Sequence, residues 1–150
     1  MKRHRSCSYD ARHSSQDGKV MHCGLCVNCL LRRTSLIWAE VEDSTEYRAV
    51  DLTAPTLEEA FRGKVPRNFH ASLDVARNSV RAMQRLAELT SEPHRMRVES
   101  EVAAVSRGLD EPIPVVREKM MHFLSQHQRE WERFLKSCGA NSWVADFAGI

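Results

Sequence analysis

Cysteines with the spacing of metal ligands lie near the start of the chain. Three of them are two residues apart in Cys23-Gly24-Leu25-Cys26-Val27-Asn28-Cys29, and Cys7 precedes them. Thiolates at this spacing can turn back onto one metal ion, and the turn directs backbone N–H groups at the sulfurs. Gly24 supplies the backbone freedom that such a turn often needs. The loop between Cys7 and Cys23 is long enough to return, so we predict a metal site made by Cys7, Cys23, Cys26 and Cys29.

Zinc is the metal that this set of thiolates favours. An iron–sulfur cluster is the alternative, but the ferredoxin run ends in a cysteine followed by proline. This chain has Leu30-Leu31-Arg32-Arg33 in that place. His22 or His13 could replace Cys7 as the fourth ligand. With all four positions filled by protein, no position remains for water or substrate, so we expect the zinc to be structural.

The distribution of charge fits a metal–thiolate centre. Zinc with four thiolates has a formal charge of −2. The first 33 residues hold seven Lys or Arg, Arg32 and Arg33 among them, against two Asp or Glu. This local surplus of positive charge would offset the charge of the centre. The whole chain of 150 residues has a net charge of +2, which by itself does not indicate a nucleic-acid-binding protein.

The cysteine count and the N-terminus indicate a reducing compartment. A disulfide framework is typical of exported chains with an even number of cysteines, whereas this chain has five, with Cys138 far from the others. The basic residues 1–6 have no apolar stretch behind them, unlike a secretory signal. No apolar run approaches the roughly 20 residues of a membrane span. We expect a cytoplasmic protein with no membrane contact.

Apolar residues at three- and four-residue steps predict a mostly α-helical protein. The clearest helix runs from the prolines at 112–114 to about Ser137 and closes at Gly139. Other helices are expected over residues 27–41, 55–63, 71–89 and 97–106. A Thr56–Glu59 capping box begins the second of these. Strand signals are confined to residues 48–52 and 142–147. We expect a small zinc-binding segment over residues 1–48 and a helical region over residues 49–150.

Aromatic residues near the C-terminus allow two interpretations. Trp131, Phe134 and Trp143 have the character of core residues, but they could also pack against a further domain. Such a surface would be exposed in the isolated chain, and it predicts self-association. His127 lies on the apolar ridge of the last predicted helix, where we expect a hydrogen-bonded core histidine.

The cysteine motif resembles the zinc motif of 7-cyano-7-deazaguanine synthases, the QueC family. The family pattern is roughly S-C, a loop, and then C-G-x-C-x-x-C-x-x-R. This chain matches it at Ser6-Cys7 and again from Cys23 to Arg32. The segment from Asp43 to Tyr47 is also similar to the family's D-x-T-x-Y. The resemblance spans residues 5–48, about a third of the chain.

The resemblance implies an ATP-dependent ligase that acts on a carboxylate. In that family, 7-carboxy-7-deazaguanine is activated by adenylation, ammonia makes the amide, and a second activation allows dehydration to the nitrile. The resemblance also implies that Cys7, Cys23, Cys26 and Cys29 are zinc ligands and that Arg32 lies behind them or at an interface. A nucleotide-binding domain precedes the zinc motif in the family, so the chain would belong to a larger α/β protein.

Two departures separate this chain from the biosynthetic enzymes. The ATP-pyrophosphatase loop S-G-G-x-D-S is absent, since no two glycines are adjacent, and G-x-x-x-x-G-K-[ST] is absent as well. We therefore assign no catalytic residue and expect ATP to act only through a QueC-like domain or partner chain that carries the loop. The second departure is the long loop before Cys23, together with the long region after the motif. The long region after the motif is similar to that of QueC-like proteins encoded in bacterial antiviral operons.

A zinc-knuckle module for nucleic-acid or protein binding is the alternative function. Its basic N-terminal block could face phosphates. However, Tyr9 is the only aromatic residue within residues 1–33 that could stack on a base. Since a four-thiolate zinc already accounts for the basic charge, we do not expect nucleic acid to be the partner.

Overall fold

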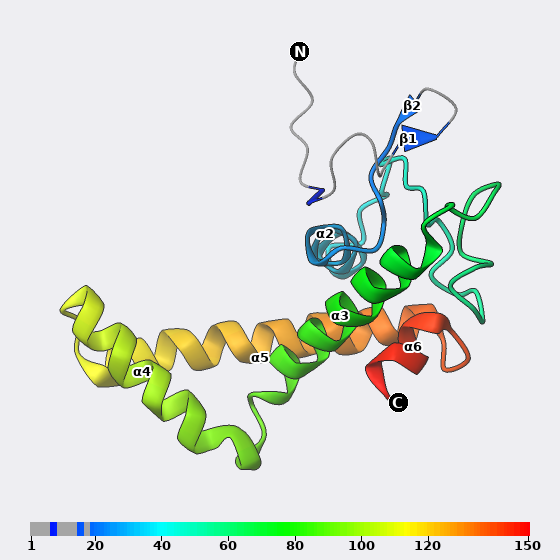
Figure 1. Ribbon diagram of the computed structural model, residues 1–150. Helices are drawn as coiled ribbons and strands as arrows, with labels where there is room; N and C mark the ends of the chain where they lie inside the picture. Colours follow the sequence, from blue (N-terminus) through cyan, green and yellow to red (C-terminus); the bar gives the residue numbers. More distant parts are fainter. Residues whose placement is uncertain (1–6, 9–14, 17–18) are drawn as a thin grey trace.

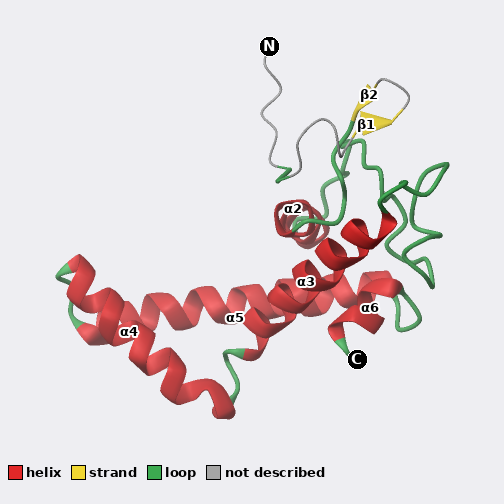
Figure 2. Ribbon diagram, in the orientation of Figure 1, coloured by secondary structure: helices red, strands yellow, loops and turns green. Residues whose placement is uncertain are grey.

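The computed structural model describes residues 7–8, 15–16 and 19–150, and nearly all of their regular structure is helical (Figure 2). Strands β1 (Ser15–Gln16) and β2 (Lys19–Val20) pair antiparallel, with Gln16 opposite Lys19. Five α-helices follow in the described part of the chain. The prediction of a mostly α protein with a cysteine-bearing N-terminal segment is confirmed. None of these helices is both long and apolar enough to cross a lipid bilayer.

Four helices make the body of the molecule. Helix α2 (Val27–Trp38) and helix α3 (Phe69–Glu88) both pack against α5 (Ile113–Cys138), and α6 (Trp143–Ala148) packs against α3 and α5 (Figure 1). The bounds of α3 and α5 agree with the predicted helices to within two residues. Helix α2 ends earlier than expected, because Glu40 has a φ of 56°, a conformation that helices do not continue through.

A second group of helices projects from the body as a helical arm. Helix α4 (Arg95–Leu109) follows the short 3-10 helix η1 (Glu92–His94) and folds back along the first half of α5 (Figure 1). We use the name helical arm for α4 and residues 113–124 of α5. Its separate small core is made by Val98, Val102, Val116 and Leu124. Helix α4 is longer than the predicted 97–106, since it ends only where Asp110 takes a left-handed conformation.

The main core joins the N-terminal segment to the body. Cys29 and Leu30 of α2 lie in one buried cluster with Trp131, Phe134 and Trp143. The three aromatic residues are less than 2 % exposed, and Trp131 stacks on Phe134 with ring centroids 5.1 Å apart. They therefore form the chain's own core, and the interpretation of these residues as an exposed docking face is wrong. Self-association itself stays a prediction.

Residues 39–68 connect α2 to α3 without a helix or a strand. The segment is nevertheless fixed by backbone contacts. Ala49 forms an antiparallel bridge with Phe61, which is all that appears of the strand expected over residues 48–52. The indole Nε1–H of Trp143 donates a hydrogen bond to the Asp51 carbonyl at 3.0 Å. The segment is thus attached to the C-terminal helix, far away in the sequence.

The helix predicted over residues 55–63 is absent, and turns take its place. The capping contact that suggested it is present, because the N–H of Glu59 donates to Thr56 Oγ1 at 3.4 Å. However, the carbonyl of Ala60 accepts a hydrogen bond from the N–H of Val50 at 2.7 Å. A helix of two turns cannot stabilise itself, so these non-local bonds decide the local structure.

A helix also replaces the strand expected over residues 142–147. Ser142 caps the start of helix α6, since its Oγ accepts a hydrogen bond from the N–H of Ala145 at 3.1 Å. Serine is among the best residues at this capping position. Trp143, Val144 and Ala145 are all buried, which a half-exposed strand would not allow. The strand prediction is therefore wrong, and the serine cap is the signal that it missed.

Candidate metal centre

Four sulfur atoms converge beside the start of α2. The Sγ atoms of Cys7, Cys23, Cys26 and Cys29 all lie within 4.8 Å of one another, and those of Cys23 and Cys29 are 3.8 Å apart. Tetrahedral zinc with bonds of about 2.3 Å to sulfur separates its ligands by about 3.8 Å. The four predicted ligands are therefore positioned to hold one metal ion. We call residues 7–8 and 19–26, which come before α2, the metal segment.

A tight turn presents backbone N–H groups to the sulfurs. The N–H groups of Leu25 and Cys26 point at Cys23 Sγ from 3.4 and 3.3 Å. The N–H of Cys23 points at Cys7 Sγ from 3.4 Å. Such contacts stabilise negative charge on thiolate ligands and fix their orientation.

Gly24 is required at this turn for two reasons. Its φ of 80° is one that side chains disfavour. A Cβ at this position would also lie 2.4 Å from the carbonyl oxygen of Ala49. The same stretch is held by the N–H of Ala49, which donates to the Cys23 carbonyl at 3.1 Å. The connection after α2 thus braces the turn that carries the ligands.

Helix α2 places two of the ligands. Cys26 is the residue that precedes its first turn, and Cys29 lies within that turn. Free N–H groups and the positive end of the helix dipole therefore lie near these sulfurs, which favours thiolates. Asn28 Nδ2 donates to Ser8 Oγ at 3.0 Å, so the residue after Cys7 is fixed to the same turn of helix.

The site is closed on most sides. Cys23, Cys26 and Cys29 are at most 5 % exposed, whereas Cys7 is half-buried. Four protein ligands in tetrahedral positions leave no place for a substrate or a reacting water. The arrangement can therefore hold an ion and crosslink the chain, and it lacks the open position that catalytic zinc needs.

Hydrogen bonds among the four sulfurs shift the pKa values of these thiols in opposite directions. Hydrogen bonding to Cys23 lowers the pKa of Cys26 and lowers that of Cys7 to about 6. Hydrogen bonding to Cys26 raises the pKa of Cys23, and hydrogen bonding to Cys23 raises that of Cys29. Crowded thiols divide in this way because adjacent thiolates repel one another. A bound dication removes the repulsion and allows all four to ionise.

The residues that resemble D-x-T-x-Y form a hydrogen-bonded unit beside the centre. Asp43 accepts bonds from the hydroxyl of Tyr47 at 2.8 Å and from the N–H of Thr45 at 3.0 Å. Burial of Asp43 opposes its ionisation, but these bonds and the charge of Arg32 together hold the pKa of the carboxyl below its ordinary value. A backbone bridge joins Tyr47 to His22, next to the first buried ligand.

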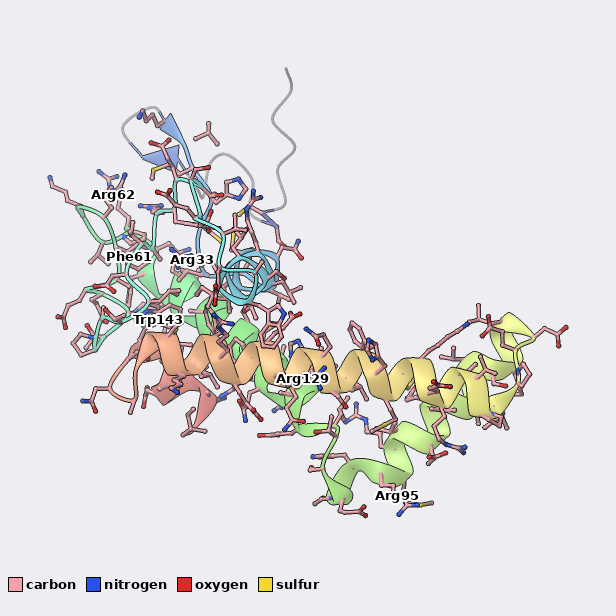
Figure 3. The ribbon with its side chains drawn as sticks, turned by 180° about the vertical axis from the view of Figure 1, so that it is seen from behind. Arg33, Phe61, Arg62, Arg95, Arg129 and Trp143 are labelled. Carbon is pink, nitrogen blue, oxygen red and sulfur yellow. The ribbon has the colours of Figure 1, made fainter. Side chains whose placement is uncertain are left out.

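The two arginines after the cysteine motif occupy different environments. Arg32, which the resemblance selects, is exposed on α2, and its role at an interface stays a prediction. Arg33 is only 6 % exposed, and it lies on the side of α2 that faces the loop carrying Phe61 (Figure 3). Its Cζ is 4.0 Å from the ring centroid of Tyr47. The sequence signal for this placement is its spacing of four residues from Cys29, which puts both on one helix face.

The histidines take no part in the cluster that the described residues form, which consists of cysteines alone. The ring of His22 instead packs edge-on against Tyr47, with centroids 6.0 Å apart. His13 lies outside the described residues. His127 is buried with its Nε2 3.0 Å from the carbonyl oxygen of Met83, which confirms the expected hydrogen-bonded core histidine. Cys138 is buried in the main core.

Fold and site together define a helical protein with a closed cluster of four cysteines that are positioned to hold a metal ion. No family model, curated protein or solved structure matches this chain. The resemblance to the QueC family therefore depends on the motif residues alone.

Proposed function

We propose that Cys7, Cys23, Cys26 and Cys29 bind one structural zinc ion. The convergence of their four sulfurs within 4.8 Å carries this proposal. Thiolates in a tetrahedral, closed site are typical of structural zinc. The bound ion would supply a rigid crosslink between the metal segment and α2. Such a site requires reduced thiols, which fits a cytoplasmic protein.

We further propose that the chain is the zinc-binding part of a QueC-like ATP-dependent ligase, such as one that converts 7-carboxy-7-deazaguanine to the nitrile. The support is that both halves of the motif resemblance belong to one structural unit. The backbone bridge between His22 and Tyr47 links the cysteine turn to the D-x-T-x-Y segment. Arg33, which belongs to the helix after the cysteine turn, packs over the ring of Tyr47 in the D-x-T-x-Y segment.

The division of labour in such a ligase follows from the sequence. The ATP loop, and with it the adenylation of the carboxylate, would come from a QueC-like domain or partner chain. The residues of this chain would hold the zinc and present a fixed surface beside that domain, with Arg32 exposed on α2 as the candidate contact.

The ligase proposal is tested by reconstitution. The chain alone should release no pyrophosphate from ATP. Addition of a QueC-like ATP-binding chain, 7-carboxy-7-deazaguanine and ammonia should give pyrophosphate and a nitrile product, and Arg32→Ala should weaken the association of the two chains. Turnover by the chain alone would contradict the proposal, as would a lack of any association. Oligonucleotide binding that weakens steeply with added salt would favour the zinc-knuckle alternative instead.

A further inference from the structure

Helix α3 and the loop before it concentrate positive charge. Residues 61–87 hold six Lys or Arg against one Asp, whereas the whole chain has a net charge of +2. Three of these cations, Arg77, Arg81 and Arg85, follow one another at four-residue steps along α3. Side chains at this spacing are neighbours on one side of a helix, so the three guanidinium groups form a line about 12 Å long. We call Arg77, Arg81 and Arg85 the arginine line.

The arginine line lies on the outer side of the body. Helix α3 packs on α2, α5 and α6, and it crosses in front of α5 in the view of Figure 1. The side chains that α3 buries lie on its other side. Arg81 and Arg85 are exposed, and Arg77 is half-buried with its Cζ 5.4 Å from the ring centroid of Phe147 in α6. The line is therefore open to a partner along its length.

In the part of the chain that the structure describes, no carboxylate forms an ion pair with the arginine line. Cations of the helical arm differ in this respect. Arg117 Nη2 lies 2.7 Å from Glu99 Oε2, and Lys119 Nζ lies 2.8 Å from Glu111 Oε2. Like charges at four-residue steps destabilise a helix. The arginine line therefore places a repulsion on α3 that acidic groups of a partner would relieve.

Two exposed carboxylates bracket the arginine line. Asp74 precedes Arg77 by three residues, and Glu88 follows Arg85 by three, so all of them lie on one side of α3. Along this side of the helix, one anion is thus followed by three cations and a second anion. A complementary surface has three carboxylates between two cations, as the surface of a protein can. The phosphates of a nucleic acid have one sign of charge only, and both ends of the line would repel them.

The phenylalanine rings beside this surface are packed against other side chains, whereas proteins that bind single strands stack the bases on open rings. Phe69 packs edge-on against Phe61, with ring centroids 6.3 Å apart. Phe147 packs in the same way against Trp143, and the guanidinium of Arg77 lies over it. Arginine itself pairs with a carboxylate through two parallel hydrogen bonds. The line therefore suits the carboxylates of a polypeptide better than a nucleic acid.

We infer that the arginine line is a docking surface for an acidic helix of a partner protein. Carboxylates at four-residue steps on such a helix lie about 6 Å apart along its axis, which is also the step of the arginines. Asn78 and Ala82 are exposed beside the line, and their short side chains leave room for a helix to approach. Helix α3 carries no predicted metal ligand, so this inference rests on neither the proposed zinc site nor the proposed ligase.

A designed helical peptide tests the docking surface. It has an alanine-rich sequence of about 20 residues, with three glutamates at four-residue steps and a lysine three residues beyond each end of that series. This pattern reads the same in both directions. Titrated into the full chain with zinc at low salt, the peptide should shift the amide NMR resonances of residues 74–88. A peptide with the same residues in scrambled order should bind about tenfold more weakly, as the loss of several exposed ion pairs predicts.

Two triple variants with the same loss of charge separate this surface from the overall charge of the chain. The α3 variant combines Arg77→Gln, Arg81→Gln and Arg85→Gln. The control variant changes three exposed arginines of α4, and it combines Arg95→Gln, Arg97→Gln and Arg107→Gln. The α3 variant should bind the peptide about tenfold more weakly than the wild type, while the control variant should stay within about twofold. The thermal midpoint of the α3 variant should not fall, because the substitutions remove repulsion within α3.

Three results with the peptide would overturn the inference: no binding to the wild type, equal affinity for the scrambled peptide, or equal losses in the two triple variants. An oligonucleotide serves as the second probe. If it binds the wild type more tightly than the peptide does, and if that binding is lost in the α3 variant, the inference is overturned in favour of a nucleic-acid partner. Such binding would fall steeply with added salt.

Discussion

The metal segment and the helical arm are held in place by different physical means. The arm has a small apolar core of Val98, Val102, Val116 and Leu124, and burial of these side chains suffices to pack α4 on α5. The metal segment has the two-residue strand β2, which pairs with β1, and a turn whose N–H groups point at sulfur. The stability of the metal segment should therefore depend on a bound metal ion, whereas the stability of the arm should not. Each region can then be disrupted separately.

The largest effect is expected from loss of a metal ligand. Cys26→Ser should lose the bound zinc and unfold the metal segment, because metal binding and folding of such sites are coupled. Helix α5 should persist, as judged by the far-ultraviolet circular dichroism. Metal content by elemental analysis is the direct measurement. Cys138→Ala, which alters a buried cysteine outside the site, is the matched control and should keep its zinc. Unchanged zinc in Cys26→Ser would rule out the four-cysteine site.

Disruption of the arm should leave the metal in place. Leu124 is 4 % exposed in the arm core, whereas the adjacent Phe123 is 59 % exposed. Leu124→Ala should lower the free energy of unfolding by about 2–5 kcal/mol, as large-to-small core substitutions do. Phe123→Ala should change it little. Both variants should carry one zinc per chain, and loss of zinc from Leu124→Ala would show that the two regions do not respond separately.

A smaller effect on stability is expected from a substitution at Gly24, in the backbone turn that carries the cysteines. Gly24→Ala would place a Cβ 2.4 Å from the Ala49 carbonyl oxygen, at a φ of 80°. It should cost about 1–3 kcal/mol and weaken zinc binding in a chelator competition. Gly108→Ala is the control, since a Cβ there meets nothing within 4 Å. In α4 it should stabilise by up to about 1 kcal/mol. Equal zinc affinity in the two variants would mean that the turn tolerates a side chain.

The smallest effect should come from an ion pair on the arm. Arg117 Nη2 lies 2.7 Å from Glu99 Oε2, with both side chains partly open to solvent. Exposed pairs of this kind contribute little to stability. Glu99→Gln should therefore leave the thermal midpoint unchanged within error. A clear drop in the midpoint would contradict the view that apolar burial alone holds α4 on α5.

The structure of these regions could be predicted from the sequence to different extents. The ligands were predictable because cysteine spacing is a direct consequence of how thiolates chelate, and α3 and α5 because long apolar ridges dominate their packing. The turns at residues 55–60 could not be predicted, because the hydrogen bond that fixes them joins the N–H of Val50 to the carbonyl of Ala60, outside the local sequence. Arg33 was one cation among several in the sequence, and only its burial against Tyr47 separates it from Arg32.

Native mass spectrometry of the purified protein, followed by the same measurement in denaturing acid, tests the central claim most directly. We expect the mass of the chain plus one zinc ion under native conditions, and the mass of the bare chain in acid. Cys138→Ala should behave like the wild type, and Cys26→Ser should show the bare chain under both conditions. A wild type without zinc under native conditions, or with an added mass of iron and sulfide, would contradict the account.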